Sequence, residues 1–303
     1  MCIRDSDHLV RFSYSDISPE DIQLLRETLD LTSVSADVAY SLEAHFGRGN
    51  WFQGFTRLDT EQMNDLAIKI NVNGSALASL RRRLDRLTRF DFVTENRVED
   101  SANMIIDRLR AGQHVVLEFG KHGNNATAYM LVANILTRRI YDRYQQQKET
   151  AMGDSKMEPP NLVITLEEAH RFLSPTMANQ TIFGTIAREM RKYNVTLLVV
   201  DQRPSDIDEE VMSQIGTKVS CLLDSARDVD SVLSGVSGSR KLRGVLSRLE
   251  TRQQALVFGH AMPMPVVIRT RDYGTPESYS LIGNGSKSPS DIKRDVDSLF
   301  GPS

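Results

Sequence analysis

Cysteine is scarce in this sequence, and long apolar runs and an excess of positive charge are missing. The two cysteines, Cys2 and Cys221, form no C-x-x-C pair, which argues against a disulfide framework or a zinc cluster and favours a reducing compartment. No apolar run approaches the roughly 20 residues that span a bilayer. The first ten residues are too charged for a signal peptide. We therefore expect a cytoplasmic protein without a membrane contact.

The charge balance and the length set further limits. The formal net charge is −3, so the protein does not hold nucleic acid by overall positive charge, and any polyanion site has to be local. The 303 residues suffice for one large domain or two smaller ones. Residues 1–6 join no pattern around them, and two interpretations stay open: a native start or an artefact at the end of a fragment.

Apolar spacing from residue 17 to residue 112 is helical. Ser18 and Pro19 precede two acids, which predicts a helix that begins at Pro19 with Ser18 as its cap. Asp59 caps a second predicted helix, and a third carries four evenly spaced leucines: Leu77, Leu80, Leu84 and Leu87. The arginines of this third helix form either a solvated face or a contact with DNA or a partner: Arg81, Arg82, Arg83 and Arg86. We expect residues 1–112 to form a helical insertion subdomain.

After Gly112 the pattern changes to an α/β one. Short β-branched runs alternate with amphipathic helices, which predicts a parallel sheet covered by helices. Residues 113–271 would form this core, and residues 272–303 a tail or linker in which 291–300 could form a short helix. The predicted strands cover 114–119, 162–166, 196–200 and 218–223, with closing strands at 254–259 and 265–271; the predicted helices cover 129–146, 179–192 and 206–215.

Two adjacent carboxylates, Glu167 and Glu168, follow the strand predicted at 162–166. Ligands bind at the carboxyl ends of the strands in an open parallel sheet. One carboxylate there can hold Mg²⁺ while the other orients an attacking water, as in a Walker B site. A strand that simply ends in acids is the plain alternative. A zinc site that adds His170 is weaker, because the H-E-x-x-H spacing is absent.

Two further segments carry candidate residues. Arg188 and Arg191 lie away from the apolar side of the predicted helix 179–192 and could reach a neighbouring subunit. Alternatively, Arg191 only complements the helix dipole. Gln202 follows the strand at 196–200, where its amide could donate to a phosphate oxygen and accept from a water. The plain alternative is a loop that caps the next helix.

Together these segments resemble the HerA family of hexameric DNA-translocating ATPases, relatives of FtsK and of the conjugation ATPases. The resemblance covers about residues 17–271 and implies a RecA-like P-loop NTPase core, with ATP and Mg²⁺ as cofactors. It also implies double-stranded DNA as partner, a homo-oligomer in the form of a hexameric ring, and a NurA-like nuclease. The matching runs are E-E-A-H-R-F at 167–172, I-A-R-E-x-R-K-Y at 186–193, Q-R-P-S-D-I-D at 202–208 and S-Q-I-G-T-K at 213–218.

The resemblance also implies roles for single residues. Glu168 would be the catalytic glutamate, Glu167 would serve the metal, and Gln202 would be the sensor. The arginine finger that a neighbouring subunit supplies would be Arg191, with Arg188 as second choice. The chain departs from the family at two positions: Asp201 replaces a small hydroxyl residue and Met190 replaces a glycine.

The sequence contains no G-x-x-x-x-G-K-[ST] motif, the loop that binds phosphate in P-loop NTPases. The run from Gly120 to Gly123 has the wrong spacing and order. In the family this loop precedes the helical insertion, so we expect the C-terminal portion of a longer ATPase, or a half that works beside a separate P-loop chain. The expected function is an ATP-driven duplex DNA translocase or helicase in DNA end processing or repair. The alternatives are a conjugation- or secretion-type ATPase and a non-catalytic assembly module.

Overall fold

The computed structural model describes residues 8–96, 101–123, 125–151, 158–178, 181–236, 238–272 and 274–275. The chain divides into two compact units, Met1–Gln214 and Ile215–Ser303. The domain boundaries predicted near residues 112 and 271 differ from this division and stay predictions. Residues 1–6 and the predicted tail helix at 291–300 lie outside the described residues. Among the helices that the structure does describe, none is both long and apolar enough to cross a membrane.

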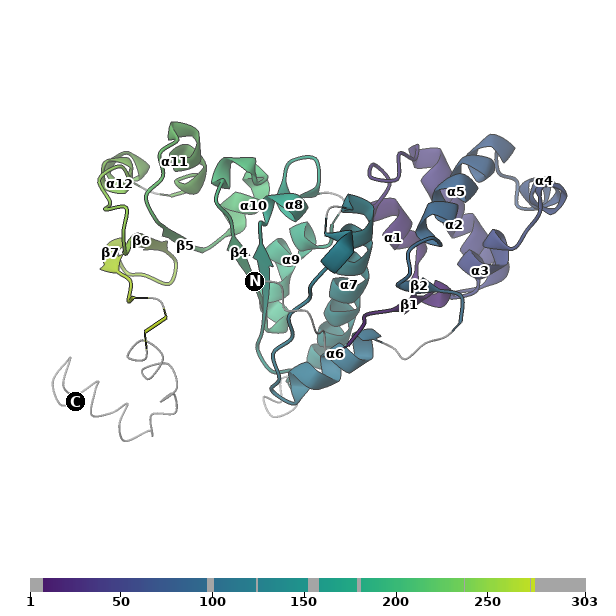
Figure 1. Ribbon diagram of the computed structural model, residues 1–303, viewed down its shortest axis with the longest axis horizontal. Helices are drawn as coiled ribbons and strands as arrows, with labels where there is room; N and C mark the ends of the chain where they lie inside the picture. The colour runs from purple at the N-terminus through teal and green to yellow at the C-terminus, as the bar shows by residue number, and fades with distance from the viewer. Residues whose placement is uncertain are drawn as a thin grey trace. The chain divides into compact units, whose positions relative to one another are not determined.

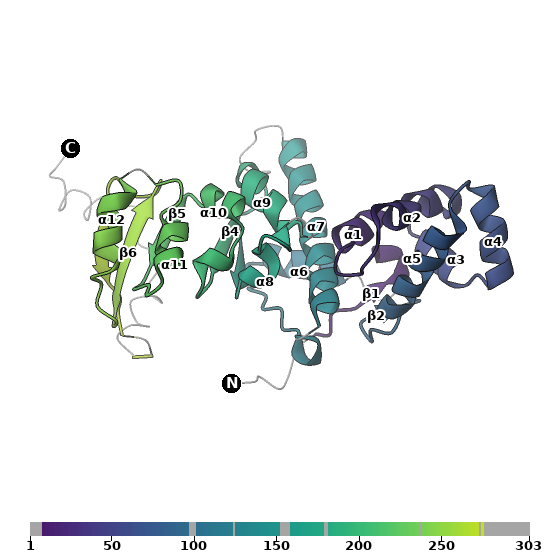
Figure 2. The ribbon, with the colours of Figure 1, turned by 90° about the horizontal axis from the view of Figure 1, so that it is seen from above.

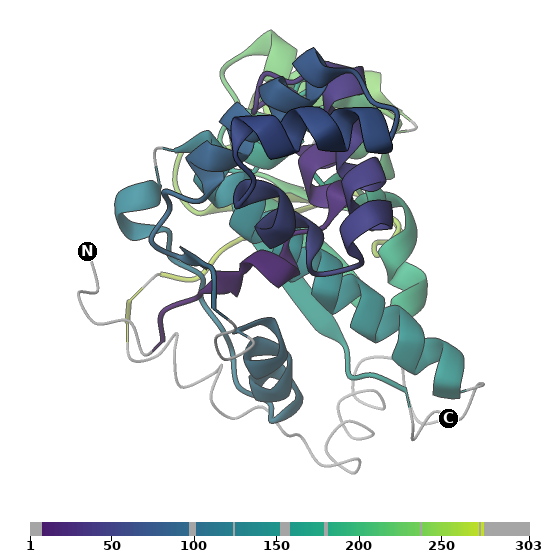
Figure 3. The same ribbon diagram turned by 90° about the vertical axis from the view of Figure 1, so that its right-hand side faces the viewer.

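The first part of unit 1 is helical, as the sequence predicts. Ser18 caps the first helix and Asp59 the fourth, each within a capping box. Figure 3 faces this bundle, whose purple and blue helices pack on one another. The elements are β1 (Phe12–Ser13), η1 (Tyr14–Asp16), α1 (Pro19–Leu24), α2 (Ser33–Phe46), α3 (Trp51–Thr56), α4 (Thr60–Lys69), α5 (Gly74–Leu87) and β2 (Val93–Thr94), with β1 and β2 paired in parallel.

The arginines of α5 have different roles. The four leucines predicted as its apolar side are all buried, which fixes the orientation of the helix. Arg81 faces α3 and donates to the carbonyl oxygens of Phe55 at 2.7 Å and Leu58 at 3.1 Å. It therefore satisfies the end of α3 instead of forming a solvated face or contacting DNA. Arg82 and Arg86 are exposed.

A buried ion pair joins α1 to the long helix α7 (Ala126–Ala151). Asp21 is fully buried, and its carboxylate accepts from Ser18 N at 2.8 Å, Ser18 Oγ at 2.9 Å and Arg138 Nη2 at 2.8 Å. Next to it, Arg139 pairs with Asp16, which is less buried. The same carboxylate thus caps α1 and anchors the bundle to α7.

Helix α7 separates α1 to α5 from β4 and its neighbours (Figure 1 and Figure 2). Strands β3 (Leu162–Glu167) and β4 (Val195–Val200) pair in parallel, with Leu162 opposite Val195 and Glu167 opposite Val200. Leu162, Leu166 and Val195 are buried. Val163, Leu198 and Val200 leave about half of their surface exposed, at 56, 48 and 45%. One face of the strand pair is therefore covered and the other is open.

Two predicted elements differ from the structure. Residues 114–119 form no strand, and Val116 is 91% exposed. The run has the β-branched residues of a strand, but among the described residues no neighbouring strand pairs with it, and strands need such a partner. The helix predicted at 179–192 is α9 (Phe183–Glu189), followed by the 3₁₀ turn η4 (Met190–Tyr193). Helix α6 (Ser101–Arg110) precedes the strandless run.

Unit 2 has an antiparallel sheet of its own, in which β6 (Gln254–Gly259) lies between β5 (Thr217–Ser220) and β7 (Val266–Arg269). The strand predicted at 218–223 therefore does not extend the parallel sheet, because β5 pairs with β6. Helices α11 (Ala226–Val232) and α12 (Ser239–Leu246) cover one face. The core of this unit contains Val229, Val232, Leu233, Leu242, Leu246, Leu249, Leu256 and Phe258.

Candidate active site

The carboxyl ends of β3 and β4 bring two of the predicted site residues together. Glu168 directly follows β3, and Gln202 lies two residues beyond the end of β4. Gln202 Nε2 donates to Glu168 Oε1 at 3.3 Å. Glu167, the last residue of β3, is exposed at the same end. The parallel register of the strands therefore brings together two residues that the sequence places after separate strands.

The backbone turns sharply at Glu168. Its φ angle is +49°, in the left-handed region that residues other than glycine rarely adopt. Hydrogen bonds hold the turn on both sides: Ala169 N donates to Val200 O at 3.3 Å, and Arg171 N donates to Glu168 O at 3.0 Å. The short helix α8 (His170–Leu173) begins directly after it. The turn leaves the Glu168 side chain 49% exposed at the end of the sheet.

Asp201 organises the loops around this turn. Its side chain is only 4% exposed. Oδ2 accepts from His170 N at 2.8 Å and lies 2.9 Å from His170 Nδ1, while Oδ1 accepts from Arg203 N at 2.7 Å. His170 Nδ1 also lies 3.7 Å from Glu168 Oε2. One buried carboxylate thus ties the loop after β4 to the start of α8.

Sequence reasoning did not assign a role to Asp201 or to its contact with His170. The signal was present, since Asp201 stands where the resembling family has a small hydroxyl residue. His170 was considered only as a zinc ligand. No group of three or more His, Cys, Asp or Glu side chains is arranged to hold a metal ion within the part of the chain that the structure describes.

Glu167 fits an ion held largely by other oxygen ligands. Mg²⁺ is usually bound by one or two carboxylates, with water and phosphate at the other positions. Among the described residues no cation pairs with Glu167, so its carboxylate is available. The donor set therefore suits Mg²⁺ with a bound phosphate better than an all-protein metal site.

The loop before α7 packs against both the bundle and the candidate site. Lys121, in the turn η2 (Gly120–His122), pairs with Asp91 at 2.5 Å. Hydrogen bonds from Lys121 and His122 lower the pKa of Asp91 to about 2. Arg171 Nη2 donates to the carbonyl oxygen of Gly123 at 2.7 Å. In this structure the Lys121 ammonium is therefore already paired with a carboxylate.

The two candidate finger arginines have defined positions in the fold. Arg188 lies in α9 and Arg191 lies in η4, the turn that leads into β4. Phe183 and Ile186 of α9 are buried, as the apolar pattern predicts. The side chains of Arg188 and Arg191 lie outside the described parts, so the trans role stays a prediction.

Replacing Asp201 by Asn should destabilise unit 1 by about 1–3 kcal/mol, because one of the three charge-assisted hydrogen bonds loses its acceptor. Trp51, the only tryptophan, is buried in unit 1, so its fluorescence during urea unfolding reports the change. Exposed Glu209, in the first turn of α10 (Glu209–Gln214), supplies the control Glu209→Gln. Equal stability of the two variants would contradict the role given to Asp201.

Several curated proteins are similar to this chain in sequence. The chain is 34% identical over 134 residues to the DNA double-strand break repair helicase HerA of Pyrococcus furiosus, covering 43% of the chain and 24% of the relative. For HerA of Sulfurisphaera tokodaii the identity is 27% over 208 residues, covering 67% and 41%. For HerA of Sulfolobus acidocaldarius it is 30% over 188 residues, covering 57% and 37%. The chain thus spans less than half the length of each of these relatives. No protein-family model matches it.

The fold is similar to that of VirB4 of Thermoanaerobacter pseudethanolicus, with a TM-score of 0.57 at 14% identity, covering 89% of this chain and 78% of VirB4. At this identity the likeness concerns the fold alone. The chain is therefore similar in sequence to HerA helicases over part of their length and has the fold of a P-loop NTPase of the VirB4 type.

Proposed function

We propose that the chain carries the hydrolytic half of an ATP-driven motor that moves along double-stranded DNA. The observation that carries the proposal is the contact between Gln202 and Glu168, at 3.3 Å, where two adjacent parallel strands end. Ligands of open parallel sheets bind at this end. The relatives named above, which are DNA repair helicases, support this choice.

The three side chains at the strand ends can divide the chemistry. Glu168 is half exposed, so its carboxylate can accept a proton from a water that attacks the γ-phosphate. The Gln202 amide can donate to a phosphate oxygen and accept from the same water. Glu167 would hold Mg²⁺, which neutralises charge on the phosphates. Hydrolysis also needs a phosphate-binding loop, which this sequence does not contain.

The family resemblance extends the proposal beyond this chain. It supports ATP as the nucleotide, a hexameric ring, a role in DNA end processing or repair, a NurA-like nuclease as partner and a cytoplasmic location. A conjugation- or secretion-type ATPase is the second candidate, because the fold likeness to VirB4 covers 89% of the chain. Stimulation of hydrolysis by duplex DNA in the absence of any secretion component would favour the translocase.

The proposal predicts inactivity of the chain alone and activity after a phosphate-binding loop is restored. For this test we define a P-loop fusion, a single chain with two parts. Its first part is the segment of the Sulfurisphaera tokodaii HerA that precedes the matched region, and its second part is this chain. We expect ATP turnover by the fusion and none by the chain alone, because the loop supplies much of the phosphate binding. Phosphate release measures both.

Two substitutions in the P-loop fusion separate the roles of the carboxylates. Glu168→Gln should abolish turnover and leave ATP bound, because the amide keeps the shape of the side chain but cannot accept the proton of the water. Glu167→Gln should instead raise the Mg²⁺ concentration needed for half-maximal turnover. Interchangeable effects would refute the division of roles, and turnover by the chain alone above its Glu168→Gln variant would refute the need for the loop.

A further inference from the structure

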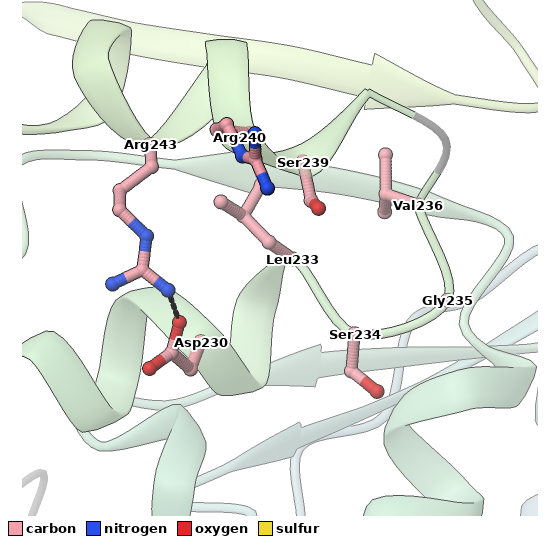
Figure 4. Close-up of a pocket in the computed structure, with 8 residues that line it drawn as sticks. All are labelled: Asp230, Leu233, Ser234, Gly235, Val236, Ser239, Arg240 and Arg243. Carbon is pink, nitrogen blue, oxygen red and sulfur yellow. Dashed lines mark hydrogen bonds and ion pairs between the residues drawn. The ribbon is translucent and has the colours of Figure 1, made fainter.

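A pocket of about 670 Å³ lies between α11 and α12 in unit 2. Figure 4 shows Arg240 on α12 and Asp230 on α11 at its sides, with the Ser234 and Ser239 hydroxyls beside it. Asp230 pairs with Arg243. The proposed function uses none of these residues, so the pocket needs an explanation of its own.

Positive charge is concentrated around this pocket. From residue 215 to residue 272 the sequence has nine lysines and arginines against five aspartates and glutamates, a formal charge of +4, while the whole chain carries −3. Much of the excess lies on or beside α12, whose Leu242 and Leu246 are buried in the core. The exposed cations there are Arg240, Lys241, Arg243 and Arg248.

Only some of these cations form an ion pair with a carboxylate. Arg243 is held by Asp230, so its charge is already compensated. For Arg240 and Lys241, no carboxylate partner occurs among the residues that the structure describes. Both lie in the first turn of α12, where the helix dipole adds further positive potential. Arg240 therefore brings an uncompensated charge to the wall of the pocket, and Lys241 is its exposed neighbour on α12.

A third cation, Lys218, is bonded to the chain segment that lines the pocket. Lys218 Nζ donates to the carbonyl oxygens of Val232 at 2.9 Å and Ser234 at 3.1 Å, and so holds the chain segment that follows α11. Burial lowers the pKa of this ammonium. Within the described ranges, no carboxylate forms an ion pair with the Lys218 ammonium. Its charge adds to the positive potential at the segment that contains Ser234, a residue of the pocket wall.

We propose that the α11–α12 pocket binds the phosphodiester backbone of duplex DNA. Arg240 and Lys241 would contact adjacent phosphates, while the Ser234 and Ser239 hydroxyls would donate to phosphate oxygens. The choice of duplex DNA rests on the proposed function, whereas the requirement for an anionic phosphate ligand comes from the pocket itself.

The test measures binding of the whole chain to a fluorescent duplex by anisotropy, over about 50–200 mM salt. Each phosphate contact contributes about 0.9 to the slope of log affinity against log salt. The double variant Arg240→Gln, Lys241→Gln should therefore lower the slope by about 2 and weaken binding at the lowest salt at least about tenfold. The effect should be the same for duplexes of different sequence, because backbone contacts carry no sequence information.

Two exposed cations of unit 1 provide a matched control. Lys69→Gln, Arg89→Gln removes the same charge and should leave both slope and affinity within about twofold of the unmodified chain. An equal loss in both variants would mean a general charge effect and would overturn the proposal. So would an unchanged slope in the α12 variant, or binding to single strands alone.

A second measurement does not depend on the variants. Hydrogen exchange of the unmodified chain, with and without duplex, should show protection over residues 238–243 and none over 74–87. Lack of protection in α12, under conditions where anisotropy shows binding, would overturn the proposal even if the double variant failed to fold. Neither experiment uses ATP, so an inactive P-loop fusion would contradict the proposed hydrolysis and leave this result standing.

Discussion

Arg191→Ala in the P-loop fusion should lower ATP turnover by about a thousandfold to a hundred-thousandfold while ATP still binds. An arginine finger stabilises charge on the transferring phosphate in the transition state and contributes this much to the rate. Arg191 lies in η4, at the end of α9 that leads into β4. If it only complemented the helix dipole, its loss would change the free energy by about 0.3–1 kcal/mol. The two interpretations therefore predict effects that differ by orders of magnitude.

Neighbouring Lys192 supplies the control for this experiment. Lys192→Ala removes a positive charge at the same helix end, and its ammonium lies 4.9 Å from the ring centroid of Tyr193. Turnover should then fall only a few fold. Mixed rings of Arg191→Ala and Glu168→Gln subunits should regain activity at interfaces where an intact arginine meets an intact glutamate. A loss below about threefold in Arg191→Ala would leave only the dipole interpretation.

The second large effect concerns the stability of unit 1. Arg138→Met should lower its free energy of unfolding by about 3–5 kcal/mol, because removing one partner of a buried ion pair leaves a buried charge without compensation. Asp21 has no exposed surface, so its carboxylate cannot regain water without opening the contact between α1 and α7. Trp51 Nε1 donates to Ile17 O at 3.0 Å, close to this pair, so its fluorescence during urea unfolding follows the loss.

Two further variants give the stability prediction its controls. Arg139→Met removes the neighbouring arginine, whose partner Asp16 is 17% exposed, and should cost clearly less. The double variant Asp21→Asn, Arg138→Met should be more stable than Arg138→Met alone, since it leaves no buried charge. A double variant that is less stable by the full sum of the single effects would show that the two side chains act independently.

Local signals in the sequence predicted the helical part of unit 1 well. Ser18, Asp59 and the leucines of α5 fix caps and buried sides through contacts within a few residues of each other, and these appear as predicted. Sheet membership depends on distant partners. Residues 114–119 have strand composition without a paired strand among the described residues, and β5 pairs with β6 instead of continuing the parallel sheet. Neither outcome is encoded in the residues of the strand itself.

The candidate site was likewise predictable only in part. The contact between Glu168 and Gln202 was predictable, because adjacent parallel strands end at one edge and each residue follows such a strand. The Asp201 contacts were not, since they depend on a loop geometry that brings His170 N within 2.8 Å of a carboxylate 31 residues away in sequence. The role of Arg81 at the end of α3 was missed for the same reason.

At Glu168, the residue that best suits the positive φ angle differs from the residue that the proposed chemistry needs. A residue with a Cβ atom in the left-handed region costs about 1–2 kcal/mol, whereas glycine adopts it freely and asparagine with less strain. Relief of this backbone strain by Gly or Asn therefore removes the carboxylate. In a library sorted only for stability, Gly or Asn should replace Glu168, whereas a library sorted for ATP turnover should keep the glutamate.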